Sequence, residues 1–400
     1  MGRAAKPGSK TPPEGIYGPT TEAVPRAILA LVPLLALAQP LGLRKQGDFW
    51  EKDFYGSALA SHRLRVIAHG PVTLLAGTTP NFSYTVRVSV RARTEAEARQ
   101  VLKSYMVRAD RVGDTLVLTA PSGPVISTFT INAPRLEWAT VSTSDGAVEA
   151  SGVDGVLNAE TGAGEFNIDR IRGDCKLTTH GGDVRVGTVG GALRCSTGAG
   201  KIAVGTVKGE CVMESVGGDI SATEIKGAVR AETGGGGIHI VRAGAGVTAS
   251  TVGGPIVVDQ AGGIVTAKNM AGPVQVGSAG GVQCESGSGG IRLTNIAGPM
   301  RVSTSLGNIM AALLLSSRLS ADSFLATANG DITVMIPSNV GVTIRAQNDL
   351  ADTLRRIQSE YPVITVRRQG RLVVAEGKVN GGGPLLQISA TVGTIFIKKQ

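Results

Sequence analysis

Aromatic side chains and cysteines are scarce in this chain of 400 residues, which has seven Phe, five Tyr, two Trp and four Cys. Glycine is the commonest residue, at 56, but it does not recur at every third position, and this excludes a collagen helix. The hydrophobic content of 42% is too high for a disordered chain. Regularly spaced Val and Ile with few charges between them indicate packed β structure.

A basic stripe along the main body of the sequence is also absent. The net charge of +9 comes from the two ends, because residues 1–135 carry +8, residues 136–336 carry −4 and residues 337–400 carry +5. A nucleic-acid-binding protein concentrates basic residues on its main surface, so we expect no nucleic-acid partner. We expect the basic ends to be solvated; the alternative is a peripheral contact with anionic membrane lipid or polysaccharide.

One apolar run stands near the N-terminus, and no later segment has the pattern of a transmembrane helix. Arg26 precedes the run at residues 27–38, and Ala36-Leu37-Ala38 fits a small-x-small cleavage site. The run is short for a bilayer span. We therefore expect residues 1–45 to be a leader with an export signal, and the alternative is an inner-membrane anchor over residues 27–43. The expected location is the periplasm, the outer envelope or the cell surface.

Residues 136–336 repeat a glycine-rich phrase with a period of 18 residues. The segment TTHGGDVRVGTVGG is followed by CSTGAGKIAVGTVKG. One position of the repeat, which we call the anchor column, is apolar in ten successive coils, with steps of 18 residues and a single step of 17. Its members are Val148, Phe166, Val184, Ile202, Ile220, Ile238, Ile256, Val274, Ile291 and Ile309.

Glycine and small polar residues occupy two further columns. Two residues before each anchor lies a glycine: Gly146, Gly164, Gly182, Gly200, Gly218, Gly236, Gly254, Gly272, Gly289 and Gly307. Five residues before it lies Ser, Thr or Asn: Thr143, Thr161, Thr179, Thr197, Ser215, Thr233, Thr251, Asn269, Ser286 and Thr304. We expect the glycines to adopt backbone conformations that other residues resist. We expect the polar column to form a ladder of hydroxyls and amides that satisfies buried backbone groups.

The remaining apolar columns lie two and five residues after the anchor, and seven and nine residues before it. Offsets that differ by two share one face of a strand, so each coil should supply two or three short strands. These features predict an all-β fold, a β-solenoid of about 11 coils with an 18-residue period. We expect the array to fold as a unit, because one coil buries too little surface to offset the cost of its ordering.

Segments without the period flank the repeats. Residues 46–135 combine strand patterns with TEAEARQVLKSYMVRAD, which begins with a capping box at Thr94 and Glu97 and predicts a helix. Residues 337–400 hold a short helix pattern, LADTLRRIQ, then two strand patterns and a closing LLQISATVGTIFIK that restores the frame. We expect a small α+β cap before the repeats and a β-rich cap with a final coil after them, covering the open edges.

Residue types that perform catalysis or bind metals form no recognisable site. All four cysteines fall in inward columns, beyond disulfide reach of one another, and are expected to be buried thiols. The four histidines have no Cys, His or acid at ligand spacing. The segment STGAGKI lacks the full phosphate-loop pattern, and most coils lack the aspartate of calcium-binding β-rolls. We therefore expect no metal, no cofactor and no catalytic residue.

A polysaccharide-active β-helix enzyme is an alternative that needs clustered outward carboxylates for acid–base chemistry. The candidates do not recur in register as a compact group; they are Asp169, Asp183, Glu214, Asp219 and Glu224. A sugar-binding groove would also offer aromatic platforms. The aromatic residues of the coil region are Trp138, Phe166 and Phe324, and Phe166 is in an inward column.

Three features together resemble the DUF4097 putative adhesin family of bacterial envelope proteins. They are the repeated T-x-x-G-x-I-x-V with a following glycine, the N-terminal sheet-and-helix segment, and the closing NGGGP and GTIFI motifs. The resemblance covers about residues 60–400 and brings no catalytic residues with it. It implies a β-solenoid associated with the cell envelope.

We interpret the chain as a non-enzymatic cell-envelope or surface protein, adhesin-like, that presents a rigid solenoid to an envelope polymer, a glycan or a protein. Alternatives are a self-assembling β-helical scaffold, the polysaccharide-active enzyme and a regulatory role in envelope stress; the oligomeric state is left open. The residues on which this interpretation depends are structural: Gly164, Gly182, Gly200, Gly218, Gly236, Gly254, Val184, Ile202, Ile220, Ile238, Thr179 and Thr197.

Overall fold

The computed structural model describes residues 42–400 except residues 316, 318 and 351. The apolar run at 27–38, with the export signal or anchor expected there, lies outside the described residues. The residues that are described belong to one compact unit. None of the helices within it has the length and apolar content needed to cross a bilayer.

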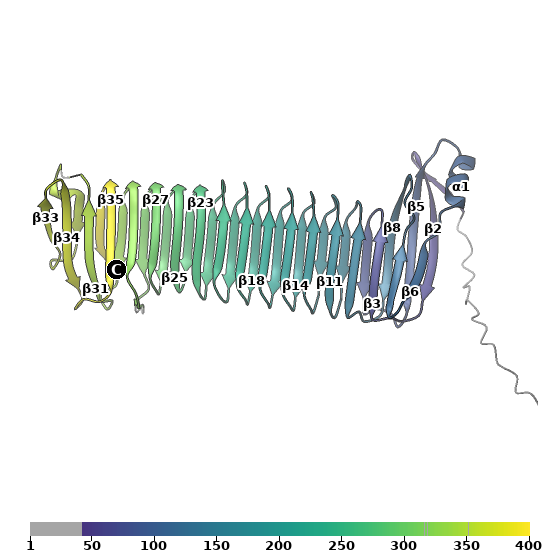
Figure 1. Ribbon diagram of the computed structural model, residues 1–400, viewed down its shortest axis with the longest axis horizontal. Helices are drawn as coiled ribbons and strands as arrows, with labels where there is room; N and C mark the ends of the chain where they lie inside the picture. The colour runs from purple at the N-terminus through teal and green to yellow at the C-terminus, as the bar shows by residue number, and fades with distance from the viewer. Residues whose placement is uncertain (1–41, 316, 318, 351) are drawn as a thin grey trace, which may run out of the picture. The chain divides into compact units, whose positions relative to one another are not determined.

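The predicted all-β solenoid is confirmed, and it is built from two long, mainly parallel sheets (Figure 1). Each repeat coil supplies one strand to each sheet. A coil therefore contains two strands, the lower of the two numbers expected. In spatial order, sheet A contains β1 (Arg44–Gln46), β2 (Phe49–Ala58), β5 (Phe82–Arg91), β8 (Val125–Ala133), β4 (Val72–Ala76), β10 (Val148–Ser151), β12 (Phe166–Asp169), β14 (Val184–Val189), β16 (Ile202–Val207), β18 (Ile220–Ile225), β20 (Ile238–Ala243), β22 (Ile256–Ala261), β24 (Val274–Ser278), β26 (Ile291–Ile296), β28 (Ile309–Leu313), β30 (Ile332–Ile336), β36 (Ile395–Lys399) and β32 (Ile357–Ser359).

Sheet B supplies the opposite wall of the core. In spatial order, it contains β6 (Arg108–Val112), β7 (Thr115–Thr119), β3 (Arg63–Ala68), β9 (Trp138–Thr143), β11 (Val156–Thr161), β13 (Cys175–Thr179), β15 (Leu193–Thr197), β17 (Cys211–Ser215), β19 (Val229–Thr233), β21 (Val247–Thr251), β23 (Ile264–Ala271), β25 (Gly281–Ser288), β27 (Met300–Leu306), β29 (Ser323–Asn329), β35 (Leu385–Val392), β31 (Val342–Asn348), β34 (Leu372–Val379) and β33 (Thr365–Gln369). The inward side chains of the two sheets form one continuous buried core.

The anchor residues lie opposite one another in sheet A. Val184 pairs with Ile202, Ile202 with Ile220, and Ile220 with Ile238, in parallel register. All four are buried, and burial stabilises each side chain by about 1.5–3 kcal/mol. Like side chains therefore stack on like, once per coil, along the whole array.

Close packing of successive coils explains much of the glycine column. At Gly164, Gly182, Gly200, Gly218, Gly236 and Gly254, an added Cβ would overlap the carbonyl group of the equivalent glycine one coil earlier. None of these six has a positive φ, whereas four other members of the column do. The prediction that these six glycines adopt conformations that other residues resist is therefore wrong. Glycine is required at these positions because a side chain would overlap the backbone of the neighbouring coil.

The N-terminal cap contains two further coils that the 18-residue period does not reveal. Strands β3 and β4 stack in parallel on β9 and β10, and β7 and β8 stack on β3 and β4. Beyond them, β6, β5, β2 and β1 pair antiparallel. The predicted helix is confirmed as α1 (Glu95–Lys103), where Thr94 Oγ1 accepts from Glu97 N at 3.2 Å.

In the C-terminal cap, the last two strands of the chain lie between the repeats and strands that precede them in the sequence. Strands β35 and β36 stack directly on β29 and β30, which restores the repeat frame as expected. Strands β31 and β32 stack outside them, and β34 and β33 follow antiparallel. The helix pattern at LADTLRRIQ yields only a short 3-10 turn, η1 (Leu354–Arg356), because the buried Ile357 enters β32 and pairs with Ile395.

Candidate functional site

The polar column five residues before the anchor links successive coils. Thr197 Oγ1 donates to Gly182 O at 2.8 Å and accepts from Gly200 N at 3.2 Å. The first of these bonds recurs between Thr161 and Gly146, Thr179 and Gly164, Ser215 and Gly200, Thr233 and Gly218, and Thr251 and Gly236. The buried hydroxyl of Ser286, after the step of 17 residues, has no partner. This ladder serves the fold, since its hydroxyls are buried.

The four cysteines are buried and unpaired, as their inward columns predict. Burial raises the pKa of the Cys175, Cys211 and Cys284 thiols to about 12, and it also raises the pKa of Cys195. A nucleophilic cysteine must be ionised near neutral pH. These four therefore act as small packing residues.

The carboxylates considered for acid–base chemistry are divided between the two sheets. Glu214 lies on β17 of sheet B, whereas the other four lie on or beside strands of sheet A. The backbone N–H of Gly237 donates to Asp219 and lowers the pKa of Asp219. Lys226 contacts Glu224 at 2.6 Å and lowers the pKa of Glu224. A general acid needs a raised pKa, so these two groups are tuned in the opposite direction.

Histidine and acid side chains are dispersed over the outer faces. Within the part of the chain that the structure describes, no three His, Cys, Asp or Glu side chains gather closely enough to hold a metal ion. His239 Nε2 lies 3.1 Å from Asp259 Oδ2 in the next coil. Sequence analysis missed this exposed pair because its members are one coil and two residues apart.

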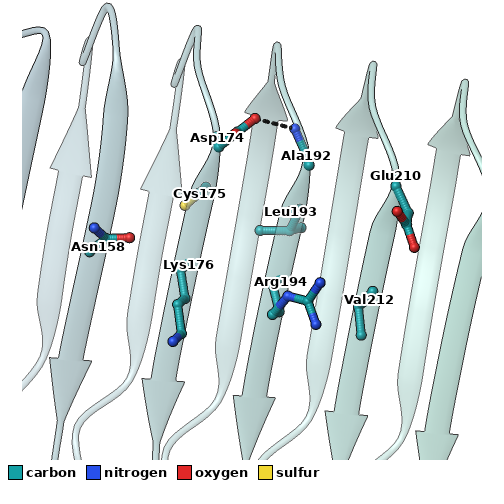
Figure 2. A pocket seen from close by; sticks show the side chains of 9 residues that line it. All are labelled: Asn158, Asp174, Cys175, Lys176, Ala192, Leu193, Arg194, Glu210 and Val212. Carbon is teal, nitrogen blue, oxygen red and sulfur yellow. Dashed lines mark hydrogen bonds between the residues drawn. The ribbon is translucent and has the colours of Figure 1, made fainter.

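A small hollow of about 220 Å³ lies on the outer face of sheet B (Figure 2). Lys176 and Arg194 project from the neighbouring strands β13 and β15, and Asp174 and Glu210 flank them. Asp174 Oδ1 already accepts from the backbone N–H of Ala192 at 2.8 Å. Two cations and two carboxylates balance, so no net charge selects a ligand here.

A larger hollow of about 890 Å³ lies at the corner after strands β10 and β12. We call it the corner groove. The groove brings together residues 75–78 at the end of β4, Arg135 before β9, and the corners of four successive repeat coils. Its charged lining residues are Arg135, Asp154, Arg170, Arg172 and Lys208. Four cations face one carboxylate, so the corner groove is basic although the repeat section as a whole is slightly acidic.

Four of the five charged side chains of the corner groove form ion pairs or hydrogen bonds within it. Arg135 Nε and Arg172 Nη1 contact the carboxylate of Asp154 at 2.5 and 3.0 Å. Arg170 donates from Nε and Nη2 to Ser151 Oγ at 3.1 and 2.7 Å. Each of the three arginine side chains is still about three-quarters exposed, at 72–75%. Their remaining N–H donors therefore face solvent.

Arg170 has a backbone conformation that arginine rarely adopts. Its φ is +55°, in the left-handed region. The equivalent residue one coil earlier is Gly152, with a φ of +80°. A residue with a Cβ in this conformation costs about 1–2 kcal/mol, and such strain concentrates at functional sites.

Sequence reasoning missed the corner groove. Its wall at residues 75–78 belongs to the coil of β3 and β4, which stacks on β9 and β10 although the two coils are far apart in sequence. The one available signal was the position six residues after the anchor, which is basic at Arg172 and Lys208 with a glycine, Gly190, between them.

Comparison with known proteins does not identify a family, because no protein-family model and no curated protein matches the chain. The DUF4097 resemblance therefore stays a prediction. Among solved structures, the chain is similar to a putative cell adhesion protein from Clostridium sporogenes (11% identity, 88% of this chain and 100% of that one, TM-score 0.18). Others are putative adhesins from Bacteroides fragilis (14%, 68% and 100%, 0.26) and Parabacteroides merdae (13%, 72% and 95%, 0.22). Similarities this weak carry no inference about function.

Proposed function

We propose that this chain is a non-enzymatic cell-envelope or surface protein, adhesin-like, that holds binding groups at fixed spacing for an extended partner. The observation that carries the proposal is the parallel, in-register stacking of the coils. Lys176 on β13 pairs with Arg194 on β15, and the same outward position recurs on each following strand of sheet B. Successive outward side chains therefore stand about 4.8 Å apart.

The core makes this spacing rigid. The inward columns are buried from the cap before the repeats to the cap after them, and the Thr, Ser and Asn ladder ties most corners to the coil before. A rigid array loses little conformational entropy when it binds a partner. This favours a binding role for an elongated polymer or protein surface.

Two further features support the proposed location of the protein and its existence as a discrete particle. The export signal expected at residues 27–38 supports a location in the envelope or at the surface. Antiparallel strands cover both sheets at one end, with β5, β2 and β1 on sheet A and β6 on sheet B, and they cover sheet B at the other end, with β34 and β33. Sheet A ends there in β32, which is only three residues long. Covered or very short edges oppose end-to-end growth, and so favour a discrete particle over a filament.

The proposal is tested by localising and binding the full chain. We expect it in the envelope fraction, accessible to an external protease or antibody, and we expect the purified protein to bind at least one component of an envelope panel without releasing products. Sizing of the purified protein should give a discrete species. A cytosolic location, filament formation or turnover of a bound glycan would each contradict the proposal.

A further inference from the structure

We infer that the corner groove binds the acidic groups of an anionic glycan, with Arg170 and Lys208 as the principal contacts. This inference rests on the proposed binding function and names a site and a ligand class for it. Four cations line the groove, and Asp154 and the adjoining Asp169 are the carboxylates that contact them. The excess of positive charge at one corner is unlike the balanced hollow on sheet B.

Lys208 and Arg170 are the two cations of the groove that do not share the Asp154 carboxylate. Lys208 is exposed and forms no ion pair with any residue that the structure describes. Arg170 is 3.6 Å from the Asp169 carboxylate, which also accepts from the backbone N–H of Thr188 at 3.0 Å. Arg135 and Arg172, by contrast, both contact the carboxylate of Asp154, which offsets part of their charge. A guanidinium can present paired N–H donors to a carboxylate or a sulfate.

The backbone at Arg170 gives an independent reason to assign a function to it. Gly152 one coil earlier and Asn295 seven coils later hold the same position of the repeat in the same left-handed region, with φ of +80° and +52°. Glycine and asparagine adopt this conformation more readily than arginine, so a structural role alone would favour one of them here. The strained arginine directs its guanidinium over Ser151, into the groove. Strain that is retained beside a basic hollow fits a ligand contact.

The shape of the groove suits a chain rather than a compact ion. Arg172 and Lys208 occupy the same position two coils apart, about 10 Å, and Gly190 leaves no side chain between them. Two cations at this separation can meet acidic groups that recur along a polymer. Hydroxyls at Thr78 and Ser151 add hydrogen-bonding partners for sugar hydroxyls.

The lining also narrows the class of ligand. No lining residue is aromatic, so neither a neutral sugar nor a nucleic-acid base finds a stacking platform. Affinity must then come from charge, which favours an acidic glycan among the polymers that an envelope protein meets. We expect binding to weaken steeply as salt is added, because exposed charges are screened.

The test measures binding of the full chain to oligogalacturonate, which carries carboxylates, and to heparin oligosaccharide, which carries sulfates, with dextran as the neutral comparison. We expect one or both acidic glycans to bind and dextran not to bind. Arg170→Gly and Lys208→Gln should each weaken binding severalfold, and the double variant by tenfold or more. Arg170→Lys, which keeps the charge but not the paired donors, should lie between Arg170→Gly and the wild type.

The controls separate the groove from general charge and from folding. Arg292→Gln removes the same charge from an exposed, distant position on β26 and should leave affinity unchanged. Arg170→Gly suits the left-handed backbone, so thermal unfolding should show it to be folded. Equal binding by the groove variants and Arg292→Gln would overturn the inference, while binding elsewhere on the chain would leave the proposed function standing. Tighter binding of oligoglutamate or oligothymidylate than of either glycan would also overturn it.

Discussion

The hydroxyl of Thr197 donates to the carbonyl oxygen of Gly182, 2.8 Å away and 15 residues earlier in the chain. The bond joins two successive coils at the corner between sheet B and sheet A. Thr197 is 2% exposed and its bond to Gly182 is partly buried, so without this partner the Gly182 carbonyl would lose a hydrogen bond that is partly shielded from water. The bond recurs in most coils and brings the corners close together, and that close spacing requires glycine.

The hydroxyl ladder should stabilise the folded state most at residues whose hydroxyl both donates and accepts a hydrogen bond. Ser215 Oγ donates to Gly200 O at 3.0 Å and accepts from Gly218 N at 2.9 Å, so Ser215→Ala should cost about 1–3 kcal/mol of unfolding free energy. Ser286 occupies the same column without a partner, and Ser286→Ala should be neutral or slightly stabilising. Denaturant unfolding of both variants measures the difference, and equal losses would refute the ladder.

Two adjacent glycines should respond very differently to one methyl group. A Cβ at Gly218 would overlap the backbone carbonyl of Gly200, whereas a Cβ at Gly217 would meet nothing within 4 Å. Gly218→Ala should therefore cost about 3 kcal/mol or more, and Gly217→Ala less than about 0.5 kcal/mol. Thermal or chemical unfolding measures both. A tolerated alanine at 218 would mean that the coils are not packed this closely.

The buried thiols should make the protein sensitive to alkali. Burial raises the pKa of Cys211 to about 12, while an unfolded thiol titrates near about 8.5. Stability from the protonated thiol is complete below the unfolded pKa, and it is lost as the pH rises through the interval up to the folded pKa. Between pH 7 and pH 10, the wild type should lose on the order of 1–2 kcal/mol more than Cys211→Ala.

Val229→Ala is the matched control for that comparison. Val229 lies one coil after Cys211 and pairs with it; its side chain is also buried, but it does not titrate. Its cost should therefore be the same at both pH values, when unfolding is measured with a reducing agent present. A pH-independent difference between the wild type and Cys211→Ala would show that the thiol is not held in its protonated form.

Arg170 should be replaceable by glycine without loss of stability. Glycine relieves the left-handed strain at this position and loses only exposed contacts, so Arg170→Gly should be within about 0.5 kcal/mol of the wild type or more stable. Arg194→Gly places glycine inside β15, at its second residue, and should cost about 1 kcal/mol. Melting temperatures of both variants measure these effects. A large decrease in the melting temperature of Arg170→Gly would show that this arginine stabilises the fold.

The repeats could be predicted from the sequence because the residue type at each position of the repeat indicates its structural role. Val184, Ile202 and Ile220 are 18 residues apart, and a fixed step of this length can place apolar residues together only if the coils stack. Small polar residues beside glycine likewise indicated the ladder. The reason for the six glycines was wrong because close approach between backbones has no signature in the sequence that differs from that of a positive φ.

The caps and the corner groove could not be predicted in the same way. Leu64 lies beside Ala139 and Val72 beside Val148, but the chain between these strands forms β5, α1 and other elements first, so no period joins them. The corner groove depends on that stacking, because residues 75–78 form one of its walls. A single strained residue such as Arg170 also has no pattern that a sequence reveals.

Distances between spin labels along sheet B test the stacked coils most directly. In a chain whose four cysteines are replaced by alanine, one label stands at Lys176 and the second at Thr248 or Arg301, four and seven coils away. Stacking at about 4.8 Å per coil predicts separations of about 19 Å and about 34 Å. Separations that do not grow in proportion to the number of coils would contradict the solenoid.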